Sequence, residues 1–211
     1  MARYERKDAY HRRAKREGYR SRAAYKLQQI QASHRLLRPG QRVVDLGCWP
    51  GGWLQVAAEA VGRQGRVVGV DRAAIDPPLA LANVFALVGD LADPGLLRRI
   101  RGELGGAADV VLSDAAPKLT GIRAADRAHE EALLEGVEAA VPLLLAPGGT
   151  LLAKLLDCPE AGSFEKRIRS QFEAVRRMRP GASRKGTTER YLLATGYHAV
   201  TAAPSSRPAR G

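Results

Sequence analysis

The segment Val43–Trp53 constrains the fold more than any other part of this 211-residue chain. A short apolar run ends in an acid and Gly47, a loop with two further glycines at 51 and 52 follows, and a helical pattern begins at Trp53. This order predicts a buried strand, a glycine-rich turn and a helix N-terminus, which form the first unit of a doubly wound α/β sheet. Glycine is expected where the backbone adopts positive φ or approaches a ligand closely.

A second apolar run, residues 66–70, ends at Asp71. An acid about 20 residues after such a glycine loop can accept hydrogen bonds from both hydroxyls of a ribose, so the unit predicts a nucleoside-bearing cofactor. The glycines are spaced G-x-x-x-G-G rather than G-x-G-x-x-G, which disfavours a dinucleotide and its pyrophosphate. Carboxylates near strand ends, at Asp45, Asp71 and Asp90, suit S-adenosylmethionine, which carries an ammonium, a sulfonium and no phosphate. A turn that binds nothing is the less favoured alternative.

Composition excludes several classes of protein. With 45% hydrophobic residues, the chain is long enough for one domain with a sizeable core and short appendages. No apolar run reaches the roughly 18 residues of a membrane span, and no signal peptide is visible, so a cytoplasmic location is expected. Cys48 and Cys158 form no disulfide framework, and the four histidines have no metal-ligand spacing, so no metal site is predicted.

Charge points to a polyanionic partner. The formal net charge is +12, and residues 1–26 hold ten bases against three acids, a net charge of +7. The same segment contains four of the six tyrosines: Tyr4, Tyr10, Tyr19 and Tyr25. Cations that meet phosphates and rings that stack on exposed bases suit RNA. Two interpretations of the first residues stay open, a solvated tail and a specific docking element.

The remaining pattern predicts alternating strands and helices in one domain. We expect a flexible basic arm over residues 1–18, an α/β domain over 19–200 and a disordered tail over 201–211. Helices are expected at 21–36 (capped by Ser21), 53–61, 91–104, 124–145 and 164–172. Strands are expected at 42–46, 67–70, 84–88, 109–113, 150–155, 174–177 and 191–195. The last two strands are joined without a helix and should pair antiparallel, and Pro142 should kink or shorten its helix.

Polar residues near the ends of predicted strands mark the expected site, because ligands of open parallel sheets bind beyond the carboxyl ends of the strands. These residues are Asp71, Asp90, Asp114 and Lys154. Lys154 interrupts an apolar strand, and a lysine placed there can have its pKa shifted towards neutrality for catalysis. A lysine that reaches solvent from an edge position is an equally good explanation of the pattern.

Five motifs in order strongly resemble the FtsJ-like RNA ribose 2′-O-methyltransferases, over about residues 18–197. The motifs are Tyr19–Leu27, Asp45–Gly47 with Pro50–Trp53, Ser113–Pro117, Ala146–Gly149 with Lys154, and Ser183–Arg184 with Glu189 and Tyr191. The branch that this chain resembles most methylates a uridine in the A-loop of 23S ribosomal RNA. The sequence departs from the family at Trp49, where a small residue is usual, and in the loop 155–162.

The resemblance implies a Rossmann-like class I methyltransferase with a seven-stranded, mostly parallel sheet, an antiparallel last strand and helices on both faces. It implies a catalytic tetrad of Lys26, Asp114, Lys154 and Glu189. It implies that S-adenosylmethionine is bound by Gly47, Gly51, Trp53, Asp71, Asp90 and Asp114. The implied partner is large-subunit ribosomal RNA or the 50S particle, and a monomer is expected.

Alternatives remain at three points. Lys154 can act as a general base if it is neutral, or as a charged donor that orients the nucleophile. The substrate can be transfer RNA, and a non-catalytic RNA-binding ribosome-assembly factor on the same scaffold is the rival class. Methylation of an exocyclic amine is disfavoured because Asp114–Pro117 lacks an aromatic residue, and methylation of a pyrimidine carbon would need Cys158 as nucleophile.

Overall fold

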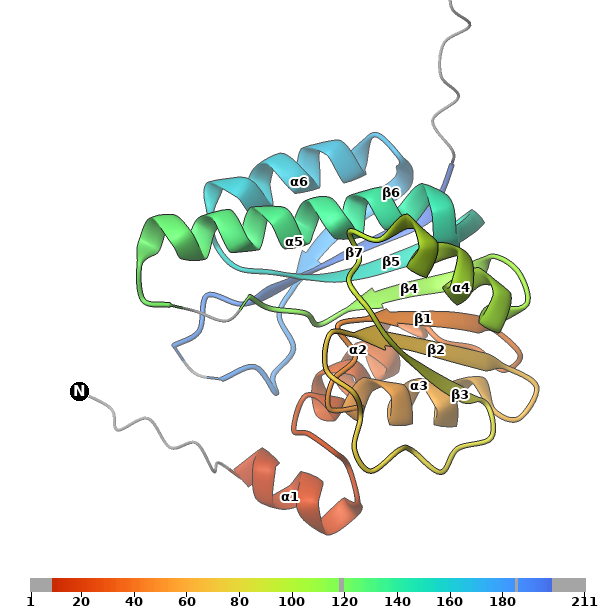
Figure 1. Cartoon of the computed structure of the whole chain (residues 1–211). Helices are drawn as coiled ribbons and strands as arrows, with labels where there is room; N and C mark the ends of the chain where they lie inside the picture. Colours follow the sequence, from red (N-terminus) through yellow and green to blue (C-terminus); the bar gives the residue numbers. More distant parts are fainter. Residues whose placement is uncertain (1–8, 118–119, 185, 199–211) are drawn as a thin grey trace, which may run out of the picture.

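The computed structural model describes residues 9–117, 120–184 and 186–198, which form one sheet between two layers of helices (Figure 1). The strands are β1 (Arg42–Leu46), β2 (Arg66–Asp71), β3 (Val84–Val88), β4 (Ala108–Ser113), β5 (Leu145–Leu155), β6 (Phe172–Met178) and β7 (Arg190–Tyr197). The helices are α1 (Ala9–Glu17), α2 (Ala24–His34), α3 (Gly52–Val61), α4 (Pro94–Leu104), α5 (Arg123–Leu144) and α6 (Pro159–Arg169).

The sheet has seven strands in the order β3-β2-β1-β4-β5-β7-β6. The first five in this order pair in parallel, and β7 pairs antiparallel with both β5 and β6. The predicted fold class, a mostly parallel Rossmann-like sheet with an antiparallel last strand, is therefore confirmed. The order reverses between β1 and β4, and this is where an open α/β sheet leaves a crevice for ligands.

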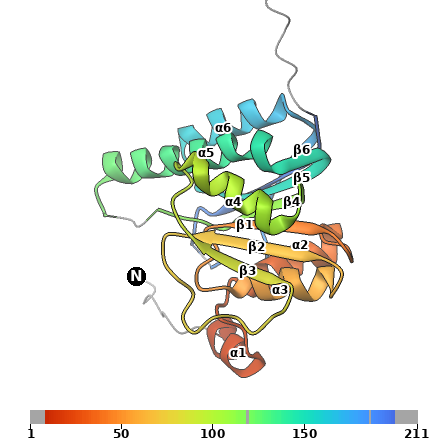
Figure 2. The ribbon, with the colours of Figure 1, turned by 45° about the vertical axis from the view of Figure 1, so that its right-hand side comes forward.

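Helices cover both faces of the sheet (Figure 2). Helices α4, α5 and α6 bury residues such as Leu96, Val141 and Phe164 against one face, and α2 and α3 bury Leu27 and Leu54 against the other. The central strands are therefore apolar on both sides, which explains why they appear in the sequence as continuous apolar runs rather than alternating ones.

Two elements begin five residues earlier than the sequence predicts, whereas the other expected bounds agree to within three residues. Strand β5 starts at Leu145 and takes in the expected turn at Pro147, because a register shift against β4 between Ala108 and Val110 accommodates the extra residues. Helix α6 starts at Pro159, which occupies its first turn. Pro142 does not end α5, which continues to Leu144, because a proline in the last turn removes little of the helix.

The expectation of a flexible basic arm is wrong for residues 9–17, which form helix α1. Ala14 is buried against Tyr25 of α2 and Ala182, and the rings of Tyr10 and Tyr25 lie 5.4 Å apart. These apolar contacts hold α1 against the rest of the domain, and the charge pattern of the sequence does not predict them. Residues 1–8 and the expected tail 201–211 lie outside the described part of the chain.

The N-terminus of α2 also differs from the expected one. The helix begins at Ala24, and its N-cap residue, Ala23, makes no side-chain cap. The predicted cap, Ser21, instead lies against α3, where a Cβ on Gly52 would come 3.4 Å from the Ser21 Cβ. Ser21 therefore contributes to the contact between the two helices on this face. Among the described residues, no helix has the length and apolar character needed to cross a membrane.

Candidate active site

The glycine loop between β1 and α3 lies at the carboxyl edge of the sheet. Gly47 and Gly51 have φ of 80° and 106°, a conformation that L side chains rarely adopt. A Cβ on Gly47 would come within 2.9 Å of the Ala115 Cα, so this position also needs glycine for space. The loop therefore lies directly against the segment that follows β4, and it leads into the first turn of α3, whose N–H groups have no acceptor within the helix.

Asp71 and Asp90 lie at the ends of two neighbouring strands, as predicted. The Asp71 carboxylate accepts hydrogen bonds from the main-chain N–H groups of Trp49 and Ala73, both at 3.0 Å. Asp90 accepts the N–H of Ala92 at 3.0 Å and pairs with Arg72 at 2.6 Å, and these contacts lower the pKa of its carboxyl. Both acids are therefore held in fixed orientations at the carboxyl edge.

An apolar pocket of about 210 Å³ adjoins this edge. Its walls come from the start of the glycine loop, the segment after β2 and strand β3, and they include Cys48, Ile75, Leu79 and Val88. A pocket with apolar walls beside two carboxylates fits a purine ring joined to a ribose. The two carboxylate acceptors and the apolar walls therefore both suit an adenosine-bearing cofactor without phosphate.

Trp53, expected at the cofactor, is buried in the core. Its side chain is 3% exposed, its indole N–H donates to the Ala23 carbonyl at 2.8 Å, and its ring stacks on Tyr191 with centroids 5.8 Å apart. The indole is therefore engaged on the side of α2 and β7. Only the main chain of Trp53, in the first turn of α3, is left to contact a ligand.

The structure brings the four predicted tetrad residues together from four separate segments. Lys26 comes from α2, Asp114 follows β4, Lys154 lies in β5 and Glu189 precedes β7. Their side chains are 9–15% exposed. The Lys154 ammonium lies 3.2 Å from the Asp114 carboxylate, and the Lys26 ammonium lies 2.7 Å from Glu189 and 3.7 Å from Asp114. The Lys154 ammonium also donates to the main-chain carbonyl of Asp114.

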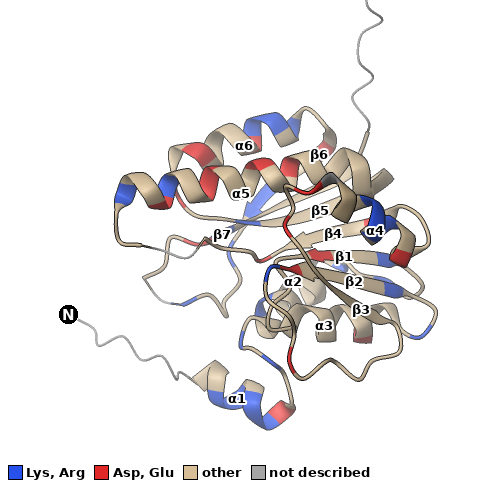
Figure 3. Cartoon of the chain, in the orientation of Figure 1, with Lys and Arg blue, Asp and Glu red and all other residues tan. Residues whose placement is uncertain are grey.

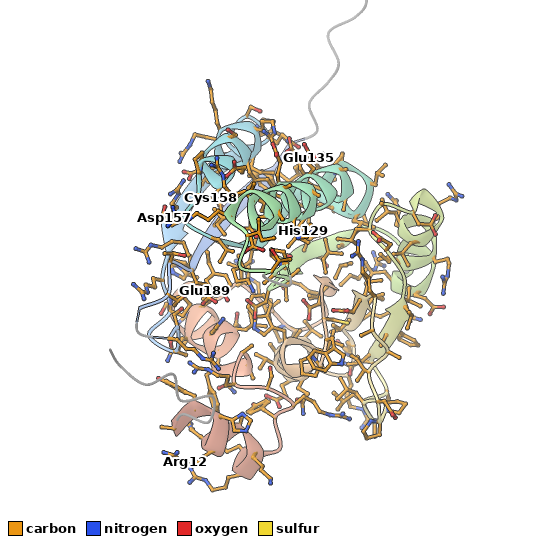
Figure 4. The ribbon with its side chains drawn as sticks, turned by 60° about the vertical axis from the view of Figure 1, so that its left-hand side comes forward. Arg12, His129, Glu135, Asp157, Cys158 and Glu189 are labelled. Carbon is orange, nitrogen blue, oxygen red and sulfur yellow. The ribbon has the colours of Figure 1, made fainter. Side chains whose placement is uncertain are left out.

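Asp114 is the shared acceptor of this cluster. Its Oδ1 atom faces both ammonium groups and accepts a 2.6 Å hydrogen bond from the Tyr191 hydroxyl. Two cations and two carboxylates balance in charge, which makes partial burial of all four groups tolerable. Figure 4 shows Glu189 next to α2, and Figure 3 shows acidic residues at the strand ends of the same edge.

Sequence reasoning gave no role to Tyr191 or Ser183. Tyr191 is fully buried and pairs in register with Lys154 across β5 and β7. Burial, and then the nearby Asp114, raise the pKa of its hydroxyl well above the usual value, so it remains a donor. The Ser183 hydroxyl donates to Glu189 at 2.9 Å. The sequence pattern that could have indicated Tyr191 is a tyrosine at the start of an apolar strand, two residues after Glu189.

Asp45 is buried among these groups with no described hydrogen-bond partner on either carboxyl oxygen. It is 1% exposed, and burial, followed by the charges of Asp114 and Asp71, raises its pKa well above the ordinary value of 3.8. An unpaired carboxyl in such a place is more stable when it is protonated. Asp45 therefore makes the fold sensitive to pH in a direction opposite to that of a salt-bridged acid.

We expect Asp45→Asn to remove this pH dependence. Above about pH 3.9, the ordinary pKa of an unfolded aspartate, the folded protein holds a proton that the unfolded chain has lost, so the free energy of unfolding falls as pH rises towards the folded pKa. The slope reaches at most about 1.4 kcal/mol per pH unit for one group. Urea unfolding of both proteins between pH 5 and 8 measures it, and parallel profiles would contradict the assignment.

Neither cysteine is suited to act as a nucleophile. Cys48 is buried and Cys158 is half-buried, and burial raises the pKa of the Cys158 thiol above its usual value. A thiol that resists ionisation is a poor nucleophile, which weighs against methylation of a pyrimidine carbon. Over the described ranges 9–117, 120–184 and 186–198, no group of three or more His, Cys, Asp or Glu side chains is placed to hold a metal ion.

A Rossmann-like sheet with a glycine loop, strand-end acids and a lysine–carboxylate cluster defines a methyltransferase-type site. Comparison with known proteins agrees, because the FtsJ-like methyltransferase family matches residues 19–197. The chain therefore belongs to the FtsJ-like methyltransferase family.

Individual relatives are similar over most of their length. A protein of Acidithiobacillus ferrooxidans named ribosomal RNA large subunit methyltransferase E is 42% identical over 92% of this chain and 87% of its own. A protein of the same name from Natronomonas pharaonis is 44% identical over 90% and 74%. The crystal structure of a ribosomal RNA methyltransferase of Plasmodium falciparum is 25% identical, with a TM-score of 0.73 over 85% of this chain and 98% of that one. An Aeropyrum pernix fibrillarin with bound S-adenosyl-L-methionine is 18% identical, with a TM-score of 0.60 over 84% and 75%, and shares the fold.

Proposed function

We propose that the protein transfers a methyl group from S-adenosylmethionine to a ribose 2′-oxygen of large-subunit ribosomal RNA. The observation that carries this proposal is the cluster of Lys26, Asp114, Lys154 and Glu189, together with a pocket suited to an adenosine that begins at the glycine loop. The names of the relatives support the RNA, and membership in the family supports the reaction. The proposed nucleotide is a uridine of the 23S A-loop, presented by the 50S particle to a monomeric, cytoplasmic enzyme.

The carboxyl edge offers a place for each part of the cofactor. In this proposal Asp71 accepts hydrogen bonds from the ribose hydroxyls, the apolar pocket takes the adenine, and Asp90 lies where the adenine end emerges. The methionine end lies along Gly47, Gly51 and the first turn of α3, near Asp114. When bound, S-adenosylmethionine would supply a methyl group on a sulfonium, whose carbon an oxygen nucleophile would attack in line while the neutral thioether leaves.

The tetrad acts on the nucleophile. The 2′-hydroxyl loses its proton as the O–CH₃ bond forms and the S–CH₃ bond breaks, and Lys154 is the tetrad ammonium held by both the carboxylate and the carbonyl of Asp114. If Lys154 is neutral it takes that proton, and if it is charged it orients the oxygen lone pair towards the methyl group while the proton passes to water. Positioning alone can lower the barrier by several kcal/mol.

We expect Asp71→Ala to weaken cofactor binding. Loss of the ribose hydrogen bonds should reduce the binding free energy by roughly 1–3 kcal/mol, because the ribose hydroxyls lose a charged acceptor. Isothermal titration calorimetry with S-adenosylmethionine measures this, and no binding of NAD is expected. Glu103→Ala, in the distant helix α4, serves as the control. Unchanged affinity in Asp71→Ala would remove this residue from the site.

We expect RNA affinity to fall steeply with salt, and helix α1 to account for part of the dependence. Lys15 and Arg16 are exposed in the last turn of α1, and Figure 3 shows the basic character of this helix, which docks on α2 beside the tetrad. On single-stranded RNA, each neutralised phosphate contributes a log–log slope of about −0.7. Neutralising both residues to Gln should therefore flatten the slope by up to roughly 1.4.

Filter-binding or fluorescence titrations from low to moderate salt give this slope. The matched control neutralises Arg98 and Arg99, two exposed bases on α4 at the other face of the sheet, and should leave the slope unchanged. A slope that responds equally to both double variants would contradict a specific role for α1.

The enzymatic proposal and its rivals are separated by mapping the product. Purified protein, S-adenosylmethionine and either 50S particles or transfer RNA are incubated, and the RNA is analysed for 2′-O-methyl nucleosides. Methylation of the ribosomal RNA is expected. Methylation of transfer RNA alone would favour that substrate, and binding without methylation of either would favour a non-catalytic assembly factor.

A further inference from the structure

Trp49 is an exposed aromatic residue on the glycine loop. It is 58% exposed, one of four large hydrophobic side chains in the described ranges that are strongly exposed. The second tryptophan, Trp53, is buried four residues later in the same motif. An indole left in solvent contributes little to the fold, so its position calls for a contact that the isolated chain does not make.

The main chain of Trp49 is held in place although its ring is free. Its N–H donates to the Asp71 carboxylate at 3.0 Å, and Pro50 restricts the backbone conformation of the residue before it. The loop begins where Leu46 pairs with Ser113 of β4, and Gly47 lies against Ala115. Trp49 therefore lies at the carboxyl edge of the sheet, with its main chain fixed on the β2 side of the loop by Asp71 and its ring exposed.

The pocket assigned to adenine does not account for the ring. The apolar pocket suited to adenine is lined by Cys48 but not by Trp49, so the indole is not one of its walls. The Asp71 carboxylate lies at the base of the loop, where it accepts the main-chain N–H of Trp49. A phosphate would be repelled there, whereas the uncharged face of a nucleobase would not.

We propose that Trp49 stacks on a nucleobase of a single-stranded segment of the substrate RNA and thereby aligns the strand whose ribose reaches Lys154. Stacking on an aromatic side chain is how proteins hold unpaired bases, and it is available only where bases are unstacked, in loops and ends. This inference rests on the proposed function, because it assumes an RNA substrate at this edge. It assigns Trp49 to substrate positioning and gives it no part in the methyl transfer itself.

Tryptophan fluorescence tests the proposal directly, because Trp49 is the exposed one of two tryptophans. The probe is a single-stranded RNA oligonucleotide with the sequence of the 23S A-loop, and the matched control is the same backbone with abasic sites. We expect the oligonucleotide to quench wild-type fluorescence, and the abasic strand, S-adenosylmethionine alone and the Trp49→Phe protein to show little quenching.

Binding and kinetics supply the second readout. Trp49→Ala should weaken RNA affinity roughly 5- to 150-fold, the equivalent of one lost base stack, and raise KM for RNA while kcat changes little. Trp49→Phe, which retains a ring, should lose less. Affinity for S-adenosylmethionine, measured by calorimetry, should be unchanged in both variants, which also shows that they fold.

Several results would overturn the stacking proposal. The first is that S-adenosylmethionine alone quenches the fluorescence and binds Trp49→Ala more weakly. The second is that intact and abasic RNA bind with equal affinity. The third is that Trp49→Ala binds RNA as tightly as the wild type. The proposed function fails separately. If the wild type binds RNA with quenching but methylates no ribose, the stacking proposal holds and the proposed reaction is wrong. If ribose methylation is the same with and without Trp49, the stacking proposal is wrong and the proposed reaction holds.

Discussion

Replacing Lys154 with alanine should lower the rate of methyl transfer by at least about 10²-fold, the lower range for a positioned proton-transfer group. Lys154 is the tetrad ammonium bonded to both the carboxylate and the carbonyl of Asp114, and its side chain is 9% exposed. Cofactor and RNA binding should be retained, because neither depends on this ammonium in the proposed site. Single-turnover assays measure the transfer step apart from binding and product release.

Lys154→Arg should not restore the rate. Arginine keeps the positive charge but cannot lose a proton at working pH, and its planar group does not fit the place of an ammonium between two oxygens of Asp114. Lys166→Ala, at an exposed position in α6, is the control and should behave as the wild type. Near-normal methylation by Lys154→Ala would contradict the tetrad assignment.

The pH dependence of the single-turnover rate distinguishes the two roles of Lys154. A general base gives a rate that rises with pH to a plateau, because only the neutral amine accepts the proton. A charged orienting group gives a rate that falls at high pH as the ammonium is lost.

Replacing Asp114 with alanine should have the largest effect on stability, and it should abolish most activity. Asp114 forms ion pairs with Lys154 and Lys26 and accepts a hydrogen bond from Tyr191, so its loss leaves Lys154 without its carboxylate and a buried hydroxyl without its acceptor. Breaking a buried ion pair on one side typically costs about 3–5 kcal/mol in the free energy of unfolding. Urea unfolding gives this quantity.

Tyr191→Phe is the matched comparison for Asp114→Ala. It removes one hydrogen bond to the same carboxylate and leaves the charges in place, so about 1 kcal/mol is expected. If the free energy of unfolding falls no further in Asp114→Ala than in Tyr191→Phe, the carboxylate does not stabilise the two lysines.

The sequence predicts the edge of the sheet where the site lies, because strand ends, positive-φ glycines and polar residues that follow apolar runs are local patterns. Gly47, Asp71 and Asp114 are examples. The grouping of Lys26 and Glu189 with them came from the resemblance to a family, since no local pattern brings residues 26 and 189 within hydrogen-bonding distance.

What the sequence did not predict depends on contacts between distant segments. Helix α1 is anchored because Ala14 meets Tyr25 and Ala182, and nothing in a run of bases indicates that contact. Tyr191 becomes part of the site because β7 pairs with β5 in a register that places it opposite Lys154. The side chain of Trp53 lies in the core, where its indole N–H donates to the Ala23 carbonyl. Burial of this kind depends on which strands and helices become neighbours.

The most direct test of the proposed function is to map methylation on 50S particles that lack the modification. Particles are incubated with S-adenosylmethionine and either the wild type or Lys154→Ala, and the ribosomal RNA is digested and analysed by mass spectrometry. The proposal predicts one new methyl group on a ribose 2′-oxygen, at a uridine of the A-loop, with the wild type and none above background with the variant. A methyl group on a base, or equal methylation by both proteins, would contradict it.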